Sequence, residues 1–458
     1  MKAIKALTLV LGLLAQPVLA QTTVDVPLGE ARVIARQALL AGDTELALQI
    51  TQALLEANPD DRIALIILAA GAPRVGQAAE GRRAGARAFA LSRTDEQRYE
   101  AARLTALAAT NEERFTLATF WLRRALNNAP NPEERARTLQ DARVVTQRNP
   151  WSTNLSFSVV PSNNVNGGAE QNEVDDLGNF VGNLSADSLA LAGVRATLGF
   201  GTSYRFFENE RNRASVAFQY QLSRVQLEDE TQPVPGNESE TVRVDSGEFS
   251  TDYYQAALRY QRAFSNGIGG AEIAAGSFDF GGEPYYDFRR ISFNRSLRAS
   301  DRTTLALSAQ REWQDFESEG LGKGARNTYR TTLSYRLDSG DRISGTLGYV
   351  TSNGDASSQT FEEWKLEYGY AFSDLIGPAA VSLNAGIRVA EYPDPNPPFW
   401  TDTRNDKGVF YRINLGFPNI EYAGFSPGLT ISGGRDESNV GRFTRNNFSV
   451  GLTINSAF

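Results

Sequence analysis

Histidine and cysteine, the side chains on which many enzymes and metal sites depend, are both absent from this sequence of 458 residues. Hydrolases of the Ser-His-Asp or Cys-His type, zinc fingers and disulfide scaffolds therefore cannot be built from it. Residues 199–204 begin like a dinucleotide fingerprint, but Tyr204 stands where the third glycine belongs. Asp175 and Asp176 lack the spaced oxygen ligands of a calcium site. We expect no enzyme, no cofactor and no metal site, and the formal net charge of -8 predicts no nucleic-acid partner.

Three short polar motifs are candidates for a functional site, the first by its own chemistry and the other two only through the family resemblance given below. The first, residues 161–166, follows an extended run and contains three asparagines, whose side chains can tie the backbone through Asx turns. The second is an Arg-x-Asp pair, and the third is a Ser-Asn-Val turn followed by an arginine. The chemistry of the first motif leaves a turn-forming role and a functional role both open. The candidate positions are Pro161, Asn163, Asn164, Asn166, Arg404, Asp406, Ser438, Asn439 and Arg445.

The elements that must position these motifs begin after a segment with the pattern of a secretory signal peptide. Lys2 and Lys5 precede an apolar run from Ala6 to Ala15, and residues 18–20 supply the small residues that a signal peptidase reads. The apolar run is too short to span a bilayer. We expect residues 1–20 to act as a signal peptide that directs the chain into the bacterial envelope.

Residues 21–148 predict a helical repeat domain. From residue 28 onward the chain is rich in Ala, Leu, Arg, Glu and Gln, and its apolar residues recur three and four apart. Gly42 lies 34 residues before Gly76, and Asp61 lies 34 residues before Asp95. A 34-residue helix-turn-helix unit is typical of tetratricopeptide repeats, whose stacked helices form a concave groove for a peptide or a partner domain. A helical spacer is the alternative.

Residues 149–458 predict an antiparallel membrane β-barrel. In residues 448–455 Phe, Val, Leu and Ile alternate with Ser, Gly, Thr and Asn, as in a strand with one face toward lipid and one toward a wet interior. Segments of this kind give about fourteen strands, which begin near residues 151, 189, 212, 250, 269, 284, 302, 325, 341, 361, 379, 404, 421 and 443. An even number brings both barrel ends to one side, where we expect tight connections such as 299–301, 338–341 and 418–421. Long polar connections, 162–187, 229–249 and 393–403, are expected to follow the first, third and eleventh strands.

Two further features of the barrel sequence have a predicted role. The inward polar faces carry arginines, which are interpreted either as solvated lining or as a translocation track: Arg195, Arg205, Arg259, Arg336, Arg388 and Arg412. Phe458 is an aromatic residue on the lipid-facing row of the last strand. We expect Phe458 to be the signal that barrel-assembly machinery recognises. The predicted fold class is N-terminal tetratricopeptide-like repeats followed by a roughly 14-stranded outer-membrane barrel.

Taken together, these features resemble the surface lipoprotein assembly modulator family, the outer-membrane translocators of the type XI secretion pathway. The resemblance rests on the signal peptide, the repeats, the Asn-Pro-Trp151 entry into the barrel, the three polar motifs and the terminal Phe458. It implies transport without covalent chemistry, with the repeat domain in the periplasm receiving a client and the barrel in the outer membrane moving it to the cell surface. The implied client is a surface lipoprotein or a related secreted protein.

Two other classes of barrel protein remain open at this point. A porin-like channel with a periplasmic helical tether would use the barrel for small solutes. An exopolysaccharide exporter also joins tetratricopeptide repeats to a barrel, although it usually carries more repeats than roughly 120 residues can hold. A neighbouring gene for a secreted protein with a small barrel domain would favour the translocator.

Overall fold

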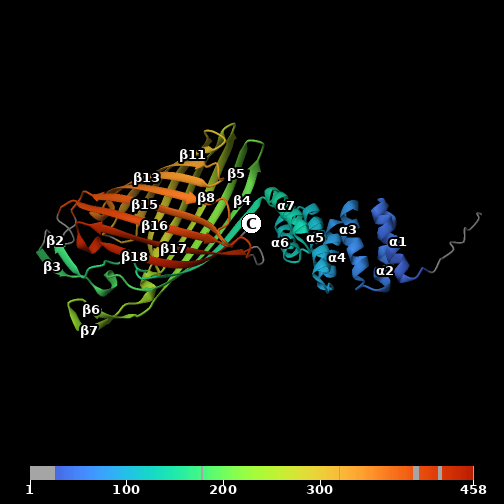
Figure 1. The fold of residues 1–458 in the computed structure, drawn as a ribbon, viewed down its shortest axis with the longest axis horizontal. Coiled ribbons are helices and arrows are strands. Elements are labelled where there is room, and N and C mark those ends of the chain that lie inside the picture. Colours follow the sequence, from blue (N-terminus) through green and yellow to red (C-terminus); the bar gives the residue numbers. More distant parts are fainter. Residues whose placement is uncertain (1–25, 177–178, 319, 396–401, 421–424, 457–458) are drawn as a thin grey trace, which may run out of the picture. The chain divides into compact units, whose positions relative to one another are not determined.

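The computed structural model describes residues 26–176, 179–318, 320–395, 402–420 and 425–456. The contacts divide the chain into a helical unit and a barrel unit, and the division falls inside helix α7, between Arg135 and Ala136 (Figure 1). The last turns of α7 therefore belong with the barrel, where Arg205 Nη2 donates to the carbonyl oxygens of Gln147 (2.9 Å) and Asn149 (3.1 Å). The domain boundary between residues 148 and 149 stays a prediction.

Seven α-helices in the described residues form three consecutive helix-turn-helix pairs, followed by α7. The odd-numbered helices begin at residues 28, 62, 95 and 132, which confirms the helical repeats and their period near 34, with a third unit a few residues longer. None of the described helices is both long enough and apolar enough to cross a membrane. The helices are α1 Leu28–Ala41, α2 Thr44–Ala57, α3 Arg62–Gly71, α4 Ala78–Ala90, α5 Asp95–Asn111, α6 Phe115–Asn127 and α7 Pro132–Arg148.

Small residues allow neighbouring helices of the repeats to approach closely. A Cβ atom at Gly85 in α4 would lie 2.3 Å from Oγ1 of Thr105 in α5, so only glycine fits there. Ala88 and Ala101 are fully buried in the same cluster. The alanine-rich composition of this region is thus the composition that close helix packing needs.

The barrel unit is a closed antiparallel sheet of fourteen strands, which confirms the predicted fold class. Each strand begins within four residues of its expected start. Two further strand pairs, β2 (Glu173–Asp176) with β3 (Asn179–Asn183) and β6 (Thr231–Val234) with β7 (Asn237–Arg243), lie in the first two long connections. The barrel strands are β1 Trp151–Ser162, β4 Gly193–Glu208, β5 Asn212–Leu227, β8 Thr251–Phe264, β9 Gly267–Phe280, β10 Glu283–Arg298, β11 Thr303–Phe316, β12 Lys323–Arg336, β13 Arg342–Gly354, β14 Phe361–Ala371, β15 Ala380–Tyr392, β16 Arg404–Gly416, β17 Phe425–Ser438 and β18 Arg445–Ser456.

The two ends of the barrel differ in the length of their connections. We call the end where β1 begins and β18 ends the proximal end, and the opposite end the distal mouth. Proximal connections include residues 209–211, 265–266 and 299–302, whereas distal connections include residues 163–192 and 228–250. The alternation is not strict, because the distal connection between β9 and β10 is only Gly281 and Gly282. Both have positive φ (64° and 86°), which a two-residue hairpin of this kind requires.

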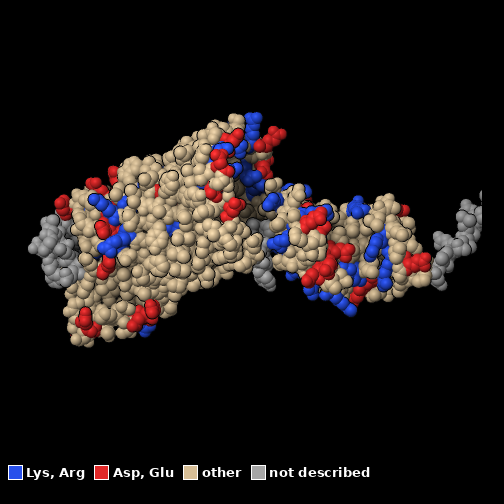
Figure 2. All heavy atoms as spheres, viewed as in Figure 1, with Lys and Arg blue, Asp and Glu red and all other residues tan. Residues whose placement is uncertain are grey.

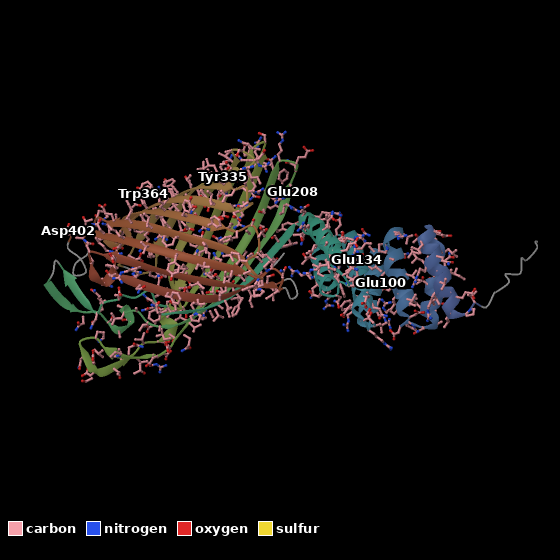
Figure 3. All side chains as sticks on the ribbon, viewed as in Figure 1. Glu100, Glu134, Glu208, Tyr335, Trp364 and Asp402 are labelled. Carbon is pink, nitrogen blue, oxygen red and sulfur yellow. The ribbon has the colours of Figure 1, made fainter. Side chains whose placement is uncertain are left out.

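The outward faces of the strands form an apolar belt. Phe293 and Leu452 keep 59% and 62% of their surface exposed although they are large and apolar. On the visible face of the barrel, charged side chains gather toward the two ends and leave a broad uncharged band between them (Figure 2). Tyr335 and Trp364 lie on the barrel wall (Figure 3), and both are exposed. A closed barrel with such a belt is suited to the bilayer of the outer membrane.

The seam between the first and last strands is the shortest pairing in the barrel. Residues 156–159 of β1 pair with residues 452–455 of β18, and pairing resumes only at Ser162 with Ser449. Pro161 lies in the interruption and has no N–H to donate to a ladder. By contrast, β1 pairs with β4 along its whole length, from Trp151 to Ser162. The continuous part of the seam therefore lies near the middle of β1 and in the proximal part of β18.

Candidate functional site

The structure brings the three predicted motifs together at the distal mouth. They lie at the end of β1 and in the connection after it, at the start of β16, and across the turn from β17 to β18. These strands are neighbours around the seam, in the order β1, β18, β17, β16. The motifs are distant in sequence and meet only because the barrel closes. Phe458 lies outside the described residues, and its expected role stays a prediction.

Asn163 and Asn164 fasten the first long connection to the last strand. The N–H of Asn163 donates to the carbonyl oxygen of Phe448 (3.2 Å), and the N–H of Phe448 donates to Asn163 Oδ1 (2.7 Å). Asn164 is 8% exposed, and its Nδ2 donates to the carbonyl oxygens of Gly168 (2.9 Å) and Asn446 (3.3 Å). These bonds continue the seam beyond its last ladder pair, Ser162 with Ser449, so both asparagines brace the closure.

Asn166 organises the return of the same connection toward β4. Its Nδ2 donates to the carbonyl oxygens of Asp187 (2.9 Å) and Leu189 (2.6 Å), and its Oδ1 accepts from the N–H of Leu191 (3.0 Å). Behind it, apolar side chains from the two long distal connections form a small core with the end of β5. That core consists of Val165, Ala186, Leu191, Val225, Leu227, Val244 and Phe249.

Arg195 links this small core to the barrel wall. Its Nη2 donates to the carbonyl oxygen of Val165 (2.5 Å), and its Nη1 donates to the carbonyl oxygen of Phe249 (3.4 Å) and to Ser223 Oγ (3.2 Å). One guanidinium thus holds both long distal connections. This bracing of the two connections could not be read from the sequence, because it depends on how the loops fold.

Arg404 and Asp406 form a buried ion pair at the start of β16. Arg404 Nε donates to Asp406 Oδ1 (3.0 Å) and Nη2 to Oδ2 (2.5 Å), and the two residues are 5% and 3% exposed. The guanidinium carbon lies 3.9 Å from the ring centroid of Tyr392 and 3.3 Å from that of Phe443. A charge pair this buried holds its position strongly, because removal of either partner leaves the other uncompensated.

Ser438 and Asn439 cap the end of the β16 and β17 ladder. Ser438 Oγ accepts from the N–H of Val440 (3.1 Å), which closes the turn. Asn439 Oδ1 accepts from the N–H of Asn405 (2.7 Å), and its Nδ2 donates to the carbonyl oxygen of Thr403 (2.9 Å). These contacts are turn chemistry, and they keep the start of β16 against the turn that precedes β18.

The side chain of Arg445, unlike those of Arg404 and Asp406, makes no hydrogen bond or salt bridge among the described residues, although its backbone pairs with Asp436 in the β17 and β18 ladder. It begins β18 and lines a cavity of about 460 Å³ in the distal mouth. Arg326 and Arg442, which the sequence motifs did not single out, line the same cavity together with Arg404.

Further inside, charged residues on the barrel wall neutralise one another. Arg290 Nη1 lies 3.3 Å from Glu312 and its Nη2 lies 3.6 Å from Glu272, which also accepts from Arg259 Nε (2.6 Å). A second group centres on Arg388, which lies 3.0 Å from Glu363 and 2.9 Å from Asp436. The alternation of side chains along each strand shows from the sequence which of them face inward. Which inward charges form pairs depends on the register between strands, which the sequence does not show.

The repeats of the helical unit are also joined by charges. Arg32 Nε donates to Asp61 (2.6 Å), and Arg82 Nε donates to Glu112 (2.8 Å). Each of these pairs spans about one repeat, since its partners lie 29 or 30 residues apart. Glu100 and Glu134, labelled in Figure 3, take part in pairs of the same kind with Arg62 and Arg103.

The barrel sequence matches one protein family. Residues 247–458 match the model described as surface lipoprotein assembly modifier, a range that extends from before β8 to the end of the chain. The matched range includes Arg326, Arg404, Asp406, Arg442 and Arg445. None of the curated proteins matches the chain.

Solved barrels of the outer membrane match the chain only distantly. OccAB3 of Acinetobacter baumannii is 9% identical, with a TM-score of 0.37, and the match covers 67% of this chain and 98% of that one. OprB of Pseudomonas putida is 9% identical, with a TM-score of 0.37, and the match covers 70% and 96%. A bacterial polysaccharide outer membrane secretin is 10% identical, with a TM-score of 0.35, and the match covers 67% and 98%. Likenesses at this level carry no information on function.

Proposed function

Because its C-terminal barrel region belongs to the surface lipoprotein assembly modifier family, we propose that this chain is an outer-membrane translocator that delivers one specific surface lipoprotein or related secreted protein to the cell surface. Membership in this family implies a role in surface lipoprotein assembly, and the family is not one of enzymes. The family match over the barrel is the observation that carries the proposal.

The organisation of the chain supports this function. Outer-membrane barrels have short periplasmic turns and longer extracellular loops, so the short proximal connections favour a periplasmic proximal end. The chain passes from the helical repeats into β1 at that end, and the repeats would then lie in the periplasm. Stacked repeats commonly bind a peptide or a partner domain, which a channel for small solutes does not need. The client, outer-membrane lipid and the barrel-assembly machinery are the partners that this function requires.

The proposal is tested by deleting the gene and measuring two properties of intact cells. Surface proteomics should show the loss of one specific protein, and uptake of small sugars and antibiotics should stay unchanged. Complementation with the full chain should restore the lost protein. The matched comparison is a chain that keeps residues 1–20 but lacks residues 21–148, which should insert as a barrel and fail to restore it.

Two results would contradict the proposal in different ways. Reduced uptake with an unchanged surface proteome would show a porin. A lost capsule or exopolysaccharide with unchanged surface proteins would show a polysaccharide exporter. Full rescue by the chain without residues 21–148 would leave the translocator standing and show that the repeats are a spacer.

A further inference from the structure

The cavity in the distal mouth has a strongly cationic lining. Four arginines, Arg326, Arg404, Arg442 and Arg445, contribute to it, and none of its described lining residues is an Asp or a Glu. The carboxylates around it already have partners: Asp406 is paired with Arg404, Asp436 with Arg388, and Glu312 accepts from Gln314 Nε2 (2.9 Å) and is paired with Arg290. The cavity volume of about 460 Å³ falls within the usual range of small-ligand sites, roughly 300 to 1,000 Å³.

Stacking between cations and rings fixes the positions of three of these arginines, Arg326, Arg404 and Arg442. The guanidinium of Arg326 lies 5.6 Å from the ring centroid of Phe361, whose ring lies 5.1 Å from that of Tyr392. Tyr392 then stacks on Arg404, and Arg404 on Phe443. We call this series the cation-aromatic row: Arg326, Phe361, Tyr392, Arg404, Phe443 and Arg442, the last with its guanidinium 5.1 Å from the ring of Phe443. A guanidinium that stacks by its face keeps its N–H groups in the plane, where they can bind a ligand.

Two donors on the cavity lining lack an acceptor. Nε of Arg326 and Nε2 of Gln359 are buried without a hydrogen-bond partner in the described residues. Arg326 also has no salt bridge among them, and neither does Arg445. Buried donors without acceptors are rare and costly in native proteins, and an unfilled ligand site is one of the reasons for which they persist.

The charges of the lining also act on one another. Burial, and after it the neighbouring charges of Arg404 and Arg445, lower the pKa of Arg442 in the turn before β18. Crowded cations of this kind are stabilised by an anion placed between them. The pairs deeper in the barrel differ, because there each cluster of arginines contains carboxylates of its own.

We infer that the cavity lined by Arg326, Arg404, Arg442, Arg445 and Gln359 binds carboxylate groups of a ligand at the distal mouth. Guanidinium groups bind carboxylates through two parallel hydrogen bonds, and the aromatic walls accommodate the apolar part that carries them. The carboxylates could belong to Asp and Glu side chains of a polypeptide in the lumen or to a small free acid. Only the first source rests on the proposed translocation.

The binding is tested with the purified full-length protein in detergent at low ionic strength. The probe is fluorescein-labelled hexaglutamate, whose anisotropy reports binding, and citrate and inorganic phosphate are the competitors. Arg326→Gln and Arg445→Gln are the test variants. Arg412→Gln is the matched control, since it removes an arginine from the same inward row of β16 as Arg404, outside the cavity lining. Resistance of the folded band to SDS at room temperature checks that each variant is folded.

We expect the wild-type protein to bind hexaglutamate, with affinity that falls as salt is added. Each test variant should bind about tenfold more weakly, as the loss of one charge-assisted hydrogen bond predicts, and Arg412→Gln should bind like the wild type. Displacement by citrate supports the site and admits a small acid as its ligand, whereas binding that citrate does not displace supports the site and assigns it to polypeptide.

The inference is wrong if neither hexaglutamate nor citrate binds, if the control loses as much affinity as the test variants, or if phosphate displaces the peptide better than citrate does. These results are independent of the gene-deletion experiment. If the gene deletion removes a client from the surface but the purified protein does not bind hexaglutamate, the proposed function stands and the inference fails. If the protein binds hexaglutamate but the deletion removes no client, the inference stands and the proposed function fails.

Discussion

The ion pair of Arg404 and Asp406 allows bracing of the barrel to be separated from function. Asp406→Asn leaves the arginine charge buried, and Arg404→Met leaves the aspartate without its partner. Both residues are at most 5% exposed, and the pair makes two hydrogen bonds. We expect each single change to lower the free energy of unfolding of the barrel by about 3 to 5 kcal/mol, the typical cost of breaking a buried pair.

The double variant Arg404→Met with Asp406→Leu should recover most of that loss. It removes both charges, so that no buried ion is left alone, and the methionine can still pack between Tyr392 and Phe443. Single losses of about 3 to 5 kcal/mol each and a double loss of only about 1 to 2 kcal/mol give an interaction energy of about 5 to 8 kcal/mol in a double-mutant cycle, because each single variant leaves a buried charge without its partner. Independent contributions would give additive losses instead.

The assay is thermal unfolding of the purified protein in lipid vesicles, followed by the loss of the SDS-resistant folded band. A loss of 1 kcal/mol shifts the midpoint by roughly 2 to 4 °C in domains of 150 to 250 residues and by less in a larger barrel, so the single variants should unfold several degrees earlier. Single variants with the midpoint of the wild type would refute the bracing role. A double variant as stable as the wild type that still fails to display the client would assign the pair to transport.

Three other outcomes are expected from the same fold. Asn164→Ala removes the three hydrogen bonds that its side chain makes with Gly168 and Asn446, at about 1 to 3 kcal/mol for each buried group left unsatisfied, and limited proteolysis should then cut residues 163–192 faster. Hydrogen bonds from the N–H of Ser373 and then the hydroxyl of Tyr370 lower the pKa of Asp341 from its ordinary 3.8 to about 2. The stability that this carboxylate contributes is complete above pH 4 and disappears as the pH falls toward 2. Thermal unfolding should therefore show a midpoint that changes less between pH 4 and pH 2 in Asp341→Asn than in the wild type. Removal of Phe458 should lower the amount of folded, heat-modifiable barrel in membranes without changing the amount of precursor that the cell synthesises. Equal levels of folded barrel with and without Phe458 would contradict its role as an assembly signal.

Most of the fold could be predicted from periodicity. The alternation of apolar and polar residues located the strands because a barrel wall separates lipid from a wet lumen along every strand. The 34-residue period located the helices because each repeat packs against a copy of itself. The lengths of the connections were less predictable, since the distal connection between β9 and β10 is only the two-residue hairpin at Gly281 and Gly282.

The site was only partly predictable, for a physical reason. Arg404, Asp406 and Arg445 were candidates because they lie in short motifs that carry the family resemblance, and such motifs can be read from the sequence alone. Arg326 was missed because its neighbours depend on the register between strands. It pairs with Ser352 of β13, which in turn pairs with Phe361 of β14, and no local sequence pattern predicts how these strands are shifted relative to one another. A signal was nevertheless present, since these residues occupy inward positions near the distal ends of successive strands.

The contrast between the two groups of charges bears on how a client could pass. The inner pairs join strands that are adjacent or next to adjacent in the sheet, as between Arg259 and Glu272 or between Arg388 and Asp436, so they follow the wall of the barrel. A charge that is already paired attracts a passing chain weakly, because binding would first have to break the pair. The arginines of the distal mouth lack that compensation at Arg326 and Arg445, and attraction is therefore concentrated where a ligand leaves or enters the lumen. Acidic groups of a translocating chain would then bind weakly along the barrel wall and more strongly at the distal mouth, which favours movement toward the mouth. The Arg326→Gln and Arg412→Gln variants compare these two regions directly.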